Sequence, residues 1–218
     1  MKALMTLSGG IDSVTLAHIM KRAEWDLTCV YLKYGSRVQE RELECSRLTA
    51  EKLEIPLIEL PFSIYEDISR SFILGNTEDY EKGGQFWLDG RNGLIAFILA
   101  IMAASRHIEH VFLGTNADDF DGVYLDTTKE FYDSTNALIR NSIRSPVKVS
   151  APFLDWDMPK SKVIQEGEEL GIDWVKYTHS CSSSNQVCLD YDNCESCYWR
   201  RQDFHDAGLS DPFAVRRP

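Results

Sequence analysis

Short apolar segments alternate with helix-like segments along this chain, and that alternation limits the folds it can adopt. Four segments are expected to form strands, at residues 2–7, 26–35 and 55–62 and within residues 110–119, where the strand runs into a turn. Segments with a helical pattern follow at residues 13–23, 37–53, 93–108 and 160–172. This order predicts an α/β domain with a parallel sheet flanked by helices. A short edge strand is also expected at residues 173–177, and residues 63–86 are polar and irregular in pattern.

Three of the expected strands run into turns that contain glycine. The strand residues before these turns are Leu7, Leu32 and Leu113, and the glycines are Gly9, Gly10, Gly35 and Gly114. Ligands of parallel α/β sheets bind beyond the carboxyl ends of the strands. We therefore expect these three turns to face a ligand.

The first turn, Ser8-Gly9-Gly10-Ile11-Asp12-Ser13, has the features of an anion cradle. A Gly-Gly junction between a strand and a helix offers backbone N–H groups and the positive end of the helix. Asp12 would repel a phosphate unless a cation lay between them, and a shared Mg²⁺ ion would satisfy both. The alternative is an ordinary turn in which Ser or Asp caps the helix.

Length and charge restrict the classes of function. The chain has 218 residues, which suits a single domain over residues 1–218. With 23 Lys and Arg against 34 Asp and Glu the net charge is −11, which disfavours a broad nucleic-acid surface. The sequence has neither a bilayer-spanning apolar run nor a signal-peptide core, so a cytoplasmic protein without membrane partners is expected.

Four of the six cysteines lie close together near the carboxyl terminus, in a segment at about residues 179–218. Cys181, Cys188, Cys194 and Cys197 have the spacing C-x6-C-x5-C-x2-C, and four thiolates can form a closed tetrahedral zinc site. One structural zinc ion per chain is therefore expected. A redox pair is the main alternative, and His179 is a possible substitute ligand.

The sequence from Ser8 to Ser13 resembles the pyrophosphate-loop motif of ATP pyrophosphatases, which cleave ATP between its α- and β-phosphates. Further stretches, in matching order over nearly the whole chain, resemble the 7-cyano-7-deazaguanine synthase (QueC) family within that group. These stretches are "YGSRVQERELE" from Tyr34, "GRN" at residues 90–92, "GTNADDFDG" at residues 114–122, "PKSKVI" with Lys160, and the cysteine-rich tail with its Phe-x-x-Ala-Gly-x-x-Asp-Pro ending.

The resemblance implies a Rossmann-like fold of the adenine nucleotide alpha hydrolase type, with a zinc-binding segment at its carboxyl end, and assigns a role to each matching residue. The implied catalytic residues are Asp12, Ser13, Arg91 and Lys160. Those implied to bind ATP are Leu7, Ser8, Gly9, Gly10, Ile11, Asp12, Ser13, Tyr34, Arg37 and Gly114, and those implied to bind the substrate are Arg91, Asn92, Asn116, Asp119 and Phe120.

Elementary chemistry is compatible with these roles. Lys160 could neutralise charge on a leaving pyrophosphate, and Arg91 could do the same or bind a carboxylate with its two-pronged guanidinium. Asn116, Asp118 and Asp119 could hydrogen-bond a purine-like edge. The alternatives are solvated charges at helix ends for Arg91 and Lys160, and a plain Asn/Asp-rich turn for the others.

By resemblance, the expected reaction converts 7-carboxy-7-deazaguanine and ammonia to 7-cyano-7-deazaguanine through an adenylated carboxylate and an amide. The partners would be the deazapurine, ATP with magnesium and free ammonia, in a homodimer. A second possibility is a QueC-like ligase of the bacterial defence type, which transfers the activated deazapurine to a protein amine. Other possibilities are a non-catalytic nucleotide- and zinc-binding interaction module and a tRNA-thiolating ATPase, although the acidic balance argues against the latter.

Two departures from the family pattern leave parts of this interpretation open. The family usually reads Asp-Cys-Arg after the substrate turn, whereas this chain has Asp126-Thr127-Thr128, and Lys129 could replace the missing arginine. The family's cysteines usually end in C-x2-C-x2-C, but Tyr191 stands at the corresponding position here. Either Cys188 or another residue could complete the metal site.

Overall fold

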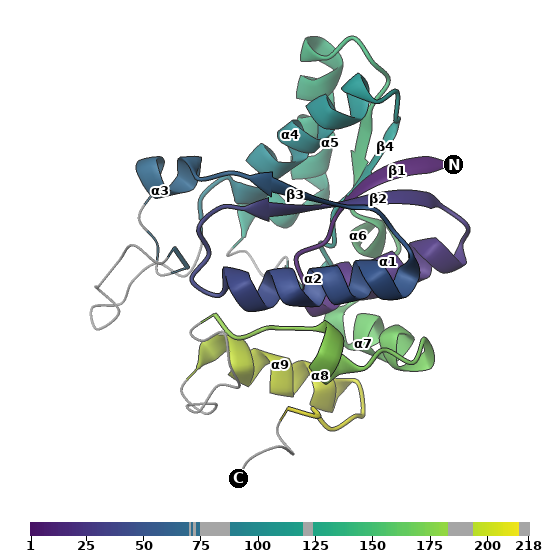
Figure 1. Cartoon of the computed structure of the whole chain (residues 1–218), viewed down its shortest axis with the longest axis vertical. Helices are drawn as coiled ribbons and strands as arrows, with labels where there is room; N and C mark the ends of the chain where they lie inside the picture. Colours follow the sequence, from purple (N-terminus) through teal and green to yellow (C-terminus); the bar gives the residue numbers. More distant parts are fainter. Residues whose placement is uncertain (70, 72, 75–87, 120–123, 183–193, 214–218) are drawn as a thin grey trace.

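The structure is a computed structural model of the chain, and it describes residues 1–69, 71, 73–74, 88–119, 124–182 and 194–213. Strands of this described part form one five-stranded sheet: β1 (Lys2–Thr6), β2 (Asp26–Lys33), β3 (Leu57–Pro61), β4 (His110–Phe112) and β5 (Lys148–Ser150). All neighbouring strands are parallel, in the order β3-β2-β1-β4-β5. Figure 1 shows the sheet edge-on between layers of helices. The predicted parallel α/β fold is confirmed.

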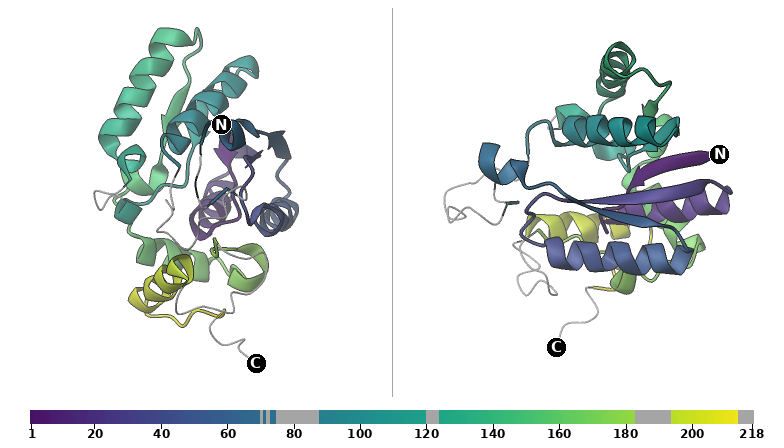
Figure 2. Two further views of the ribbon diagram at one scale, coloured as in Figure 1. Left: turned by 90° about the vertical axis from the view of Figure 1, so that its left-hand side faces the viewer. Right: turned by 45° about the horizontal axis from the view of Figure 1, so that its top comes forward.

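Helices cover both faces of the sheet. One face carries α1 (Ile11–Arg22) and α2 (Gln39–Leu53), and the other carries α4 (Arg91–Ser105) and α5 (Lys129–Ser142), as Figure 2 shows from two further sides. Shorter elements are α3 (Ile64–Ile68), α6 (Pro152–Asp155) and the 3-10 turns Ala117–Asp119 and Leu125–Thr127. Because the central strand β1 is covered on both sides, its pattern is continuously apolar rather than alternating.

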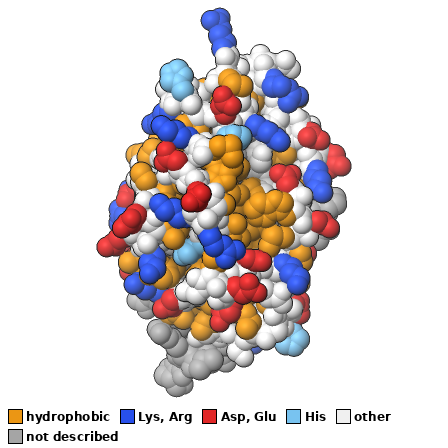
Figure 3. Space-filling model, turned by 90° about the vertical axis from the view of Figure 1, so that its right-hand side faces the viewer, with side chains coloured by type: hydrophobic (Ala, Val, Ile, Leu, Met, Phe, Trp, Pro, Cys, Tyr) orange, Lys and Arg blue, Asp and Glu red, His pale blue; other side chains and the backbone are white. Residues whose placement is uncertain are grey.

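The strands begin at the end of the molecule that Figure 3 displays. On this face Lys and Arg side chains are interspersed with Asp and Glu around apolar side chains, and they do not merge into a basic surface. Within the described residues, no helix combines the length and apolar character needed to cross a membrane.

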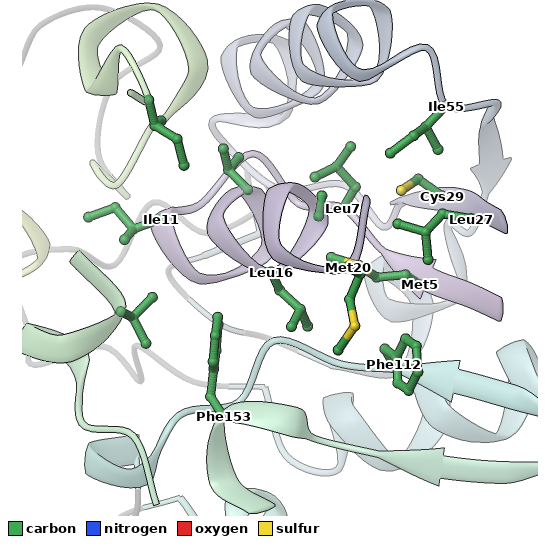
Figure 4. Packing of buried hydrophobic residues seen from close by; sticks show 14 of the residues in the cluster. Met5, Leu7, Ile11, Leu16, Met20, Leu27, Cys29, Ile55, Phe112 and Phe153 are labelled. Carbon is green, nitrogen blue, oxygen red and sulfur yellow. The ribbon is translucent and has the colours of Figure 1, made fainter. Parts of the chain in front are cut away.

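Two hydrophobic cores lie on opposite faces of the sheet. Successive side chains of a strand point to opposite faces, so Leu4 belongs to one core and Met5 to the other, and both are fully buried. Figure 4 shows the core beneath α1, where Leu16 and Met20 pack with Met5 and Phe153. The second core joins the sheet to α4 and α5.

A third layer of helices packs outside α1 and α2. It consists of α7 (Lys160–Glu169), α8 (Trp174–Tyr177) and α9 (Glu195–Asp206). Val163, Trp174 and Phe204 of these helices belong to the same core cluster as Leu16 of α1. The carboxyl-terminal helices are thus joined to the sheet domain by a continuous apolar contact.

Residues 173–177 are not an edge strand, and this prediction is wrong. They form α8, because the Asp173 side chain accepts hydrogen bonds from the N–H groups of Val175 and Lys176 and caps a helix. Residues 63–86, expected to be irregular, include α3, while residues 70, 72 and 75–87 lie outside the described part. Four further elements occur where the sequence pattern predicted none, namely α5, β5, α6 and α9.

We predict that Gly167→Ala lowers the free energy of unfolding by about 1–3 kcal/mol. A methyl group at this position of α7 would lie 2.1 Å from Cη2 of Trp174 and 3.1 Å from Oγ1 of Thr15. Trp174 is buried, and its Nε1–H donates to Glu168 (2.8 Å), so the ring has little freedom to move away. Urea denaturation measures the change.

The matched control is Gly93→Ala in α4, where the added methyl group would make ordinary contacts with Phe131, at 3.5 and 3.8 Å. This variant should be neutral or more stable by up to about 1 kcal/mol, because alanine favours a helix over glycine. Equal stability changes in the two variants would contradict the described packing of α7 on α8.

Candidate functional site

The Ser8–Ser13 loop joins β1 to the first turn of α1, and its backbone is fixed by its own hydroxyl groups. The N–H of Ser8 donates to Oγ of Ser13 (3.1 Å), and the Ser13 hydroxyl donates to the carbonyl of Gly10 (3.1 Å). Gly9 has a φ of +76°, and a Cβ there would lie 2.3 Å from the carbonyl oxygen of Glu42 in α2. Only glycine satisfies both conditions, so the loop lies directly on α2.

The turn after β4 meets this loop. A Cβ at Gly114 would lie 3.1 Å from the backbone nitrogen of Ser13, so this glycine permits a close approach of the two segments. Asn116 donates from Nδ2 to Oδ1 of Asp12 (3.4 Å), and its backbone N–H donates to Oδ2 of Asp119 (3.0 Å). The expected phosphate loop and the expected substrate turn are therefore in direct contact.

Lys160 lies at the start of α7 and reaches the same loop. Its Nζ donates a hydrogen bond to Oδ2 of Asp12, and its backbone N–H donates to Oδ2 of Asp118 (2.7 Å). Burial alone would lower the pKa of Lys160, but the charges of Asp12 and Asp119 outweigh it and raise that pKa. The ammonium therefore stays charged next to the loop.

Asp119 is a buried carboxyl group whose surroundings oppose its ionisation. Burial, followed by the nearby charge of Asp12, raises the pKa of Asp119 to about 6, although Lys160 opposes the shift. An added cation would relieve this concentration of negative charge.

A second cationic centre, Arg91, lies at the start of α4. A side-chain hydrogen bond joins it to Tyr34, and the charges of Asp126 and Glu42 help to raise the pKa of Arg91 against the effect of burial. Asn92 anchors this corner, because its N–H donates to Oδ2 of Asp126 (2.9 Å) and its Nδ2 donates to the Asp126 carbonyl (3.1 Å).

A cavity of about 460 Å³ connects the loop to Arg91. The sequence-predicted residues that line it are Ser8, Gly10, Asp12, Ser13, Tyr34, Arg91, Asn92, Gly114 and Asp119. Asn116 and Lys160 reach it through their hydrogen bonds to Asp12. The fold therefore brings most of the predicted site residues to one place.

Some of the predicted site residues are not among those that line this cavity. The side chains of Leu7 and Ile11 belong to the core beneath α1, so they can contribute only backbone groups to a ligand. Gly9 and Arg37 are not among the lining residues, and the Arg37 N–H donates to the carbonyl of Ile73 (2.8 Å). Phe120 lies outside the described residues.

The cavity also has lining residues that were not predicted, notably Glu42, Thr115 and Asp126. Glu42 accepts a hydrogen bond from the Tyr31 hydroxyl (3.2 Å), and burial raises its pKa. Glu42 lies one helical turn before Ser46, a buried residue of α2, so its place became recognisable only once the structure showed which face of this helix is buried.

The Asp126-Thr127-Thr128 segment has a clear structural role. Thr127 is buried, and its hydroxyl lies within hydrogen-bonding distance of the carbonyls of Tyr124 (2.6 Å) and Asp119 (3.0 Å). Thr128 caps α5 by accepting from the N–H of Phe131 (3.0 Å). Lys129 is exposed at the start of α5 and is not among the residues that line the cavity.

Three of the four predicted cysteine ligands form a buried cluster. The Sγ atoms of Cys181, Cys194 and Cys197 all lie within 4.8 Å of one another, and that of Cys181 is 3.9 Å from that of Cys194. Hydrogen bonds to the other two thiols, followed by burial, raise the pKa of Cys197. The cluster fits a bound metal ion.

The fourth ligand is not among these atoms. Cys188 lies outside the described residues, and His179 is not part of the cluster. The backbone N–H of His179 donates to the carbonyl of Gly9 in the Ser8–Ser13 loop (2.8 Å).

Solved structures that resemble this chain share its fold. A U34-tRNA thiolase, NcsA from Methanococcus maripaludis with its [4Fe-4S] cluster, has a TM-score of 0.55 at 19% identity, with 94% of this chain and 72% of that one covered. An NMN synthetase from Francisella tularensis has a TM-score of 0.54 at 17% identity, with coverage of 98% and 80%.

Relatives found by sequence comparison have a higher sequence identity to this chain than these solved structures. The 7-cyano-7-deazaguanine synthase of Methanoculleus marisnigri is 30% identical, with 99% of each chain covered. The enzyme of the same name from Methanocaldococcus jannaschii is 29% identical, with 97% of each covered. Residues 2–208 match the family described as Queuosine biosynthesis protein QueC. The chain therefore belongs to the QueC family.

Proposed function

We propose that this chain is an ATP-dependent ligase that converts 7-carboxy-7-deazaguanine and ammonia to 7-cyano-7-deazaguanine. The observation that carries the proposal is the single cavity shared by the Ser8–Ser13 loop and Arg91. An anion-binding loop and a guanidinium in one cavity suit a reaction between a nucleotide phosphate and a carboxylate. The names of the relatives supply the substrate class.

In the proposed reaction, a carboxylate oxygen of the substrate attacks the α-phosphorus of ATP and pyrophosphate leaves. Ammonia then adds to the acyl carbon and AMP departs with the carboxylate oxygen, which yields the amide. In a second round the amide oxygen attacks the α-phosphorus of another ATP and pyrophosphate leaves. Loss of both amide protons and of AMP, which carries the amide oxygen away, then forms the nitrile.

The residues of this chain would act mainly by position and charge. Backbone N–H groups of the Ser8–Ser13 loop would bind the β- and γ-phosphates, and Lys160 would offset the charge that develops on pyrophosphate. Asp12 would hold a magnesium ion, which supplies positive charge between the carboxylate and the phosphates. Arg91 would orient the substrate carboxylate towards the α-phosphate.

We further propose that the cysteine cluster holds zinc. The tetrahedral geometry of zinc, with Zn–S bonds of about 2.3 Å, requires sulfurs about 3.8 Å apart. The 3.9 Å separation of Cys181 and Cys194 supports a single ion of this type. In a cubane iron–sulfur cluster each cysteine binds a different iron, which would hold the sulfurs farther apart.

We also propose that residues 1–218 form one domain that acts in the cytoplasm as a homodimer. The core shared by α1, α7 and α9 supports one domain. Ile101 of α4 and Leu138 of α5, each more than half exposed, offer apolar surface for a second copy. The acidic balance and the mixed charges in Figure 3 support small-molecule partners rather than nucleic acid.

For the reaction, we predict that Asp12→Asn lowers kcat at least about 100-fold. The variant loses the carboxylate that would hold magnesium and that now pairs with Lys160. The measurement follows AMP, pyrophosphate and the nitrile by chromatography and mass spectrometry, with 7-carboxy-7-deazaguanine, ATP and ammonium as reactants.

Asp133→Asn, which changes an exposed carboxylate on α5, serves as the matched control and should retain full activity. The proposal fails if the wild-type chain forms no AMP and no nitrile. A product attached to an added protein, with no free nitrile, would instead identify a protein amine as the acceptor.

For the metal site, we predict one zinc ion per chain by elemental mass spectrometry, and loss of most of it in Cys197→Ser. Because structural zinc contributes to folding, this variant should also unfold at a lower temperature. Cys45→Ser changes a buried thiol outside the cluster and should retain the metal. Iron with visible absorbance in anaerobically purified protein would contradict the assignment of zinc.

A further inference from the structure

A short segment, Thr178 to Cys181, connects the cysteine cluster to the Ser8–Ser13 loop. His179 donates its backbone N–H to the carbonyl of Gly9 (2.8 Å), and Cys181, two residues later, belongs to the cluster. We call residues 178–181 the tail strap. It lies between the proposed phosphate site and α9.

The hydrogen bond from His179 bears directly on a phosphate-binding group. The carbonyl of Gly9 and the N–H of Gly10 belong to the same planar trans peptide, so they point in opposite directions. Fixing the Gly9 carbonyl on the tail strap therefore fixes the direction of the Gly10 N–H, and Gly10 lines the cavity. A peptide between two glycines rotates easily. Within the loop the Gly10 N–H donates to Oγ of Ser8 at 3.4 Å, and the His179 N–H holds the other side of the same peptide from outside the loop.

Arg200 of α9 holds the tail strap on both sides of His179. Its Nη1 donates to Oγ1 of Thr178 (3.1 Å) and to Oγ of Ser180 (3.0 Å). Its Nε donates to Oδ1 and Oδ2 of Asp211 (3.1 and 3.2 Å), and the guanidinium is buried. A single buried side chain thus joins α9 to both neighbours of His179.

The buried face of α9 connects this contact to the metal cluster. Cys197, Arg200 and Phe204 are the buried residues of the helix, spaced as one helical face. Asp203 lies three residues after Arg200, and its carboxylate interacts electrostatically with Lys160. Burial raises the pKa of Asp203 to about 6, and the charge of Lys160 opposes that shift. One helix therefore contacts the cluster and the tail strap and influences the proposed catalytic lysine.

We propose that Arg200 is a positioning residue for ATP: through Thr178 and Ser180 it holds the His179 N–H on the Gly9 carbonyl, and so aims the Gly10 N–H at the bound phosphates. This inference rests on the proposed role of the Ser8–Ser13 loop in ATP binding. It assigns the carboxyl-terminal segment a part in nucleotide affinity beyond holding a metal.

The test compares two serine-to-alanine changes on either side of Cys181. Ser180→Ala removes one Arg200 contact, whereas Ser182→Ala removes a hydroxyl that pairs with Ser196 (2.9 Å) and not with Arg200. The probe is α,β-methylene-ATP with magnesium, an analogue that cannot be cleaved between those phosphates, and calorimetry gives its dissociation constant. We expect Ser180→Ala to weaken binding about five- to tenfold and Ser182→Ala to leave it unchanged.

Further readouts separate positioning from general stability. In Ser180→Ala the KM for ATP should rise in parallel with the dissociation constant, while kcat at saturating ATP and the metal content stay at wild-type values. Ser180→Thr, which keeps a hydroxyl, should restore the affinity. Arg200→Lys should weaken binding more than Ser180→Ala, because lysine cannot bridge Thr178, Ser180 and Asp211.

Wild-type affinity for the analogue in Ser180→Ala overturns the positioning role, even if Arg200→Lys fails to fold. Equal weakening in Ser180→Ala and Ser182→Ala also overturns it, because it would point to a general effect on the segment. A wild-type chain that does not bind the analogue overturns both this inference and the proposed function, whereas failure confined to the variants overturns the inference alone.

Discussion

The reversal of strand order between β1 and β4 is the constraint on which the rest of the structure depends. β1 continues to β2 on one side, and β4 starts the other half of the sheet, so the connections after these two strands leave a crevice at their carboxyl ends. The Ser8–Ser13 loop and the turn that holds Asn116 meet there because Gly114 lets the two backbones approach closely. Lys160 then reaches Asp12 from α7.

Charge balance in this crevice accounts for how the site could work. Asp12, Asp119, Asp126 and Glu42 bring several carboxyl groups close to the two cations, Arg91 and Lys160. The raised pKa of Asp119 reflects burial together with this excess of negative charge. A magnesium ion would offset the excess negative charge. The phosphates of a bound nucleotide would then lie between this cation and the N–H groups of the Ser8–Ser13 loop. The site is therefore suited to a metal–nucleotide complex rather than to a free anion.

The sequence predicted the elements that follow strong local rules and missed those that depend on tertiary contacts. The Ser8–Ser13 loop was recognisable because the chain must turn there from a buried strand into a helix. In contrast, residues 173–177 have the apolar character of a strand, and the Asp173 cap together with burial of Trp174 against α7 makes them helical. β5 has only three residues, too few for a visible pattern. The tail strap was unpredictable, since its key contact uses a backbone N–H and carries no sequence signature.

The central claim is that the substrate's own oxygen attacks ATP, and isotope transfer tests this most directly. The substrate 7-carboxy-7-deazaguanine would be labelled with heavy oxygen in its carboxylate and incubated with the enzyme, unlabelled ATP and ammonium. Adenylation of the carboxylate, and then of the amide, predicts that the AMP recovered from both rounds carries one labelled oxygen in its phosphate, as read by mass spectrometry. Unlabelled AMP formed together with the nitrile would contradict the account.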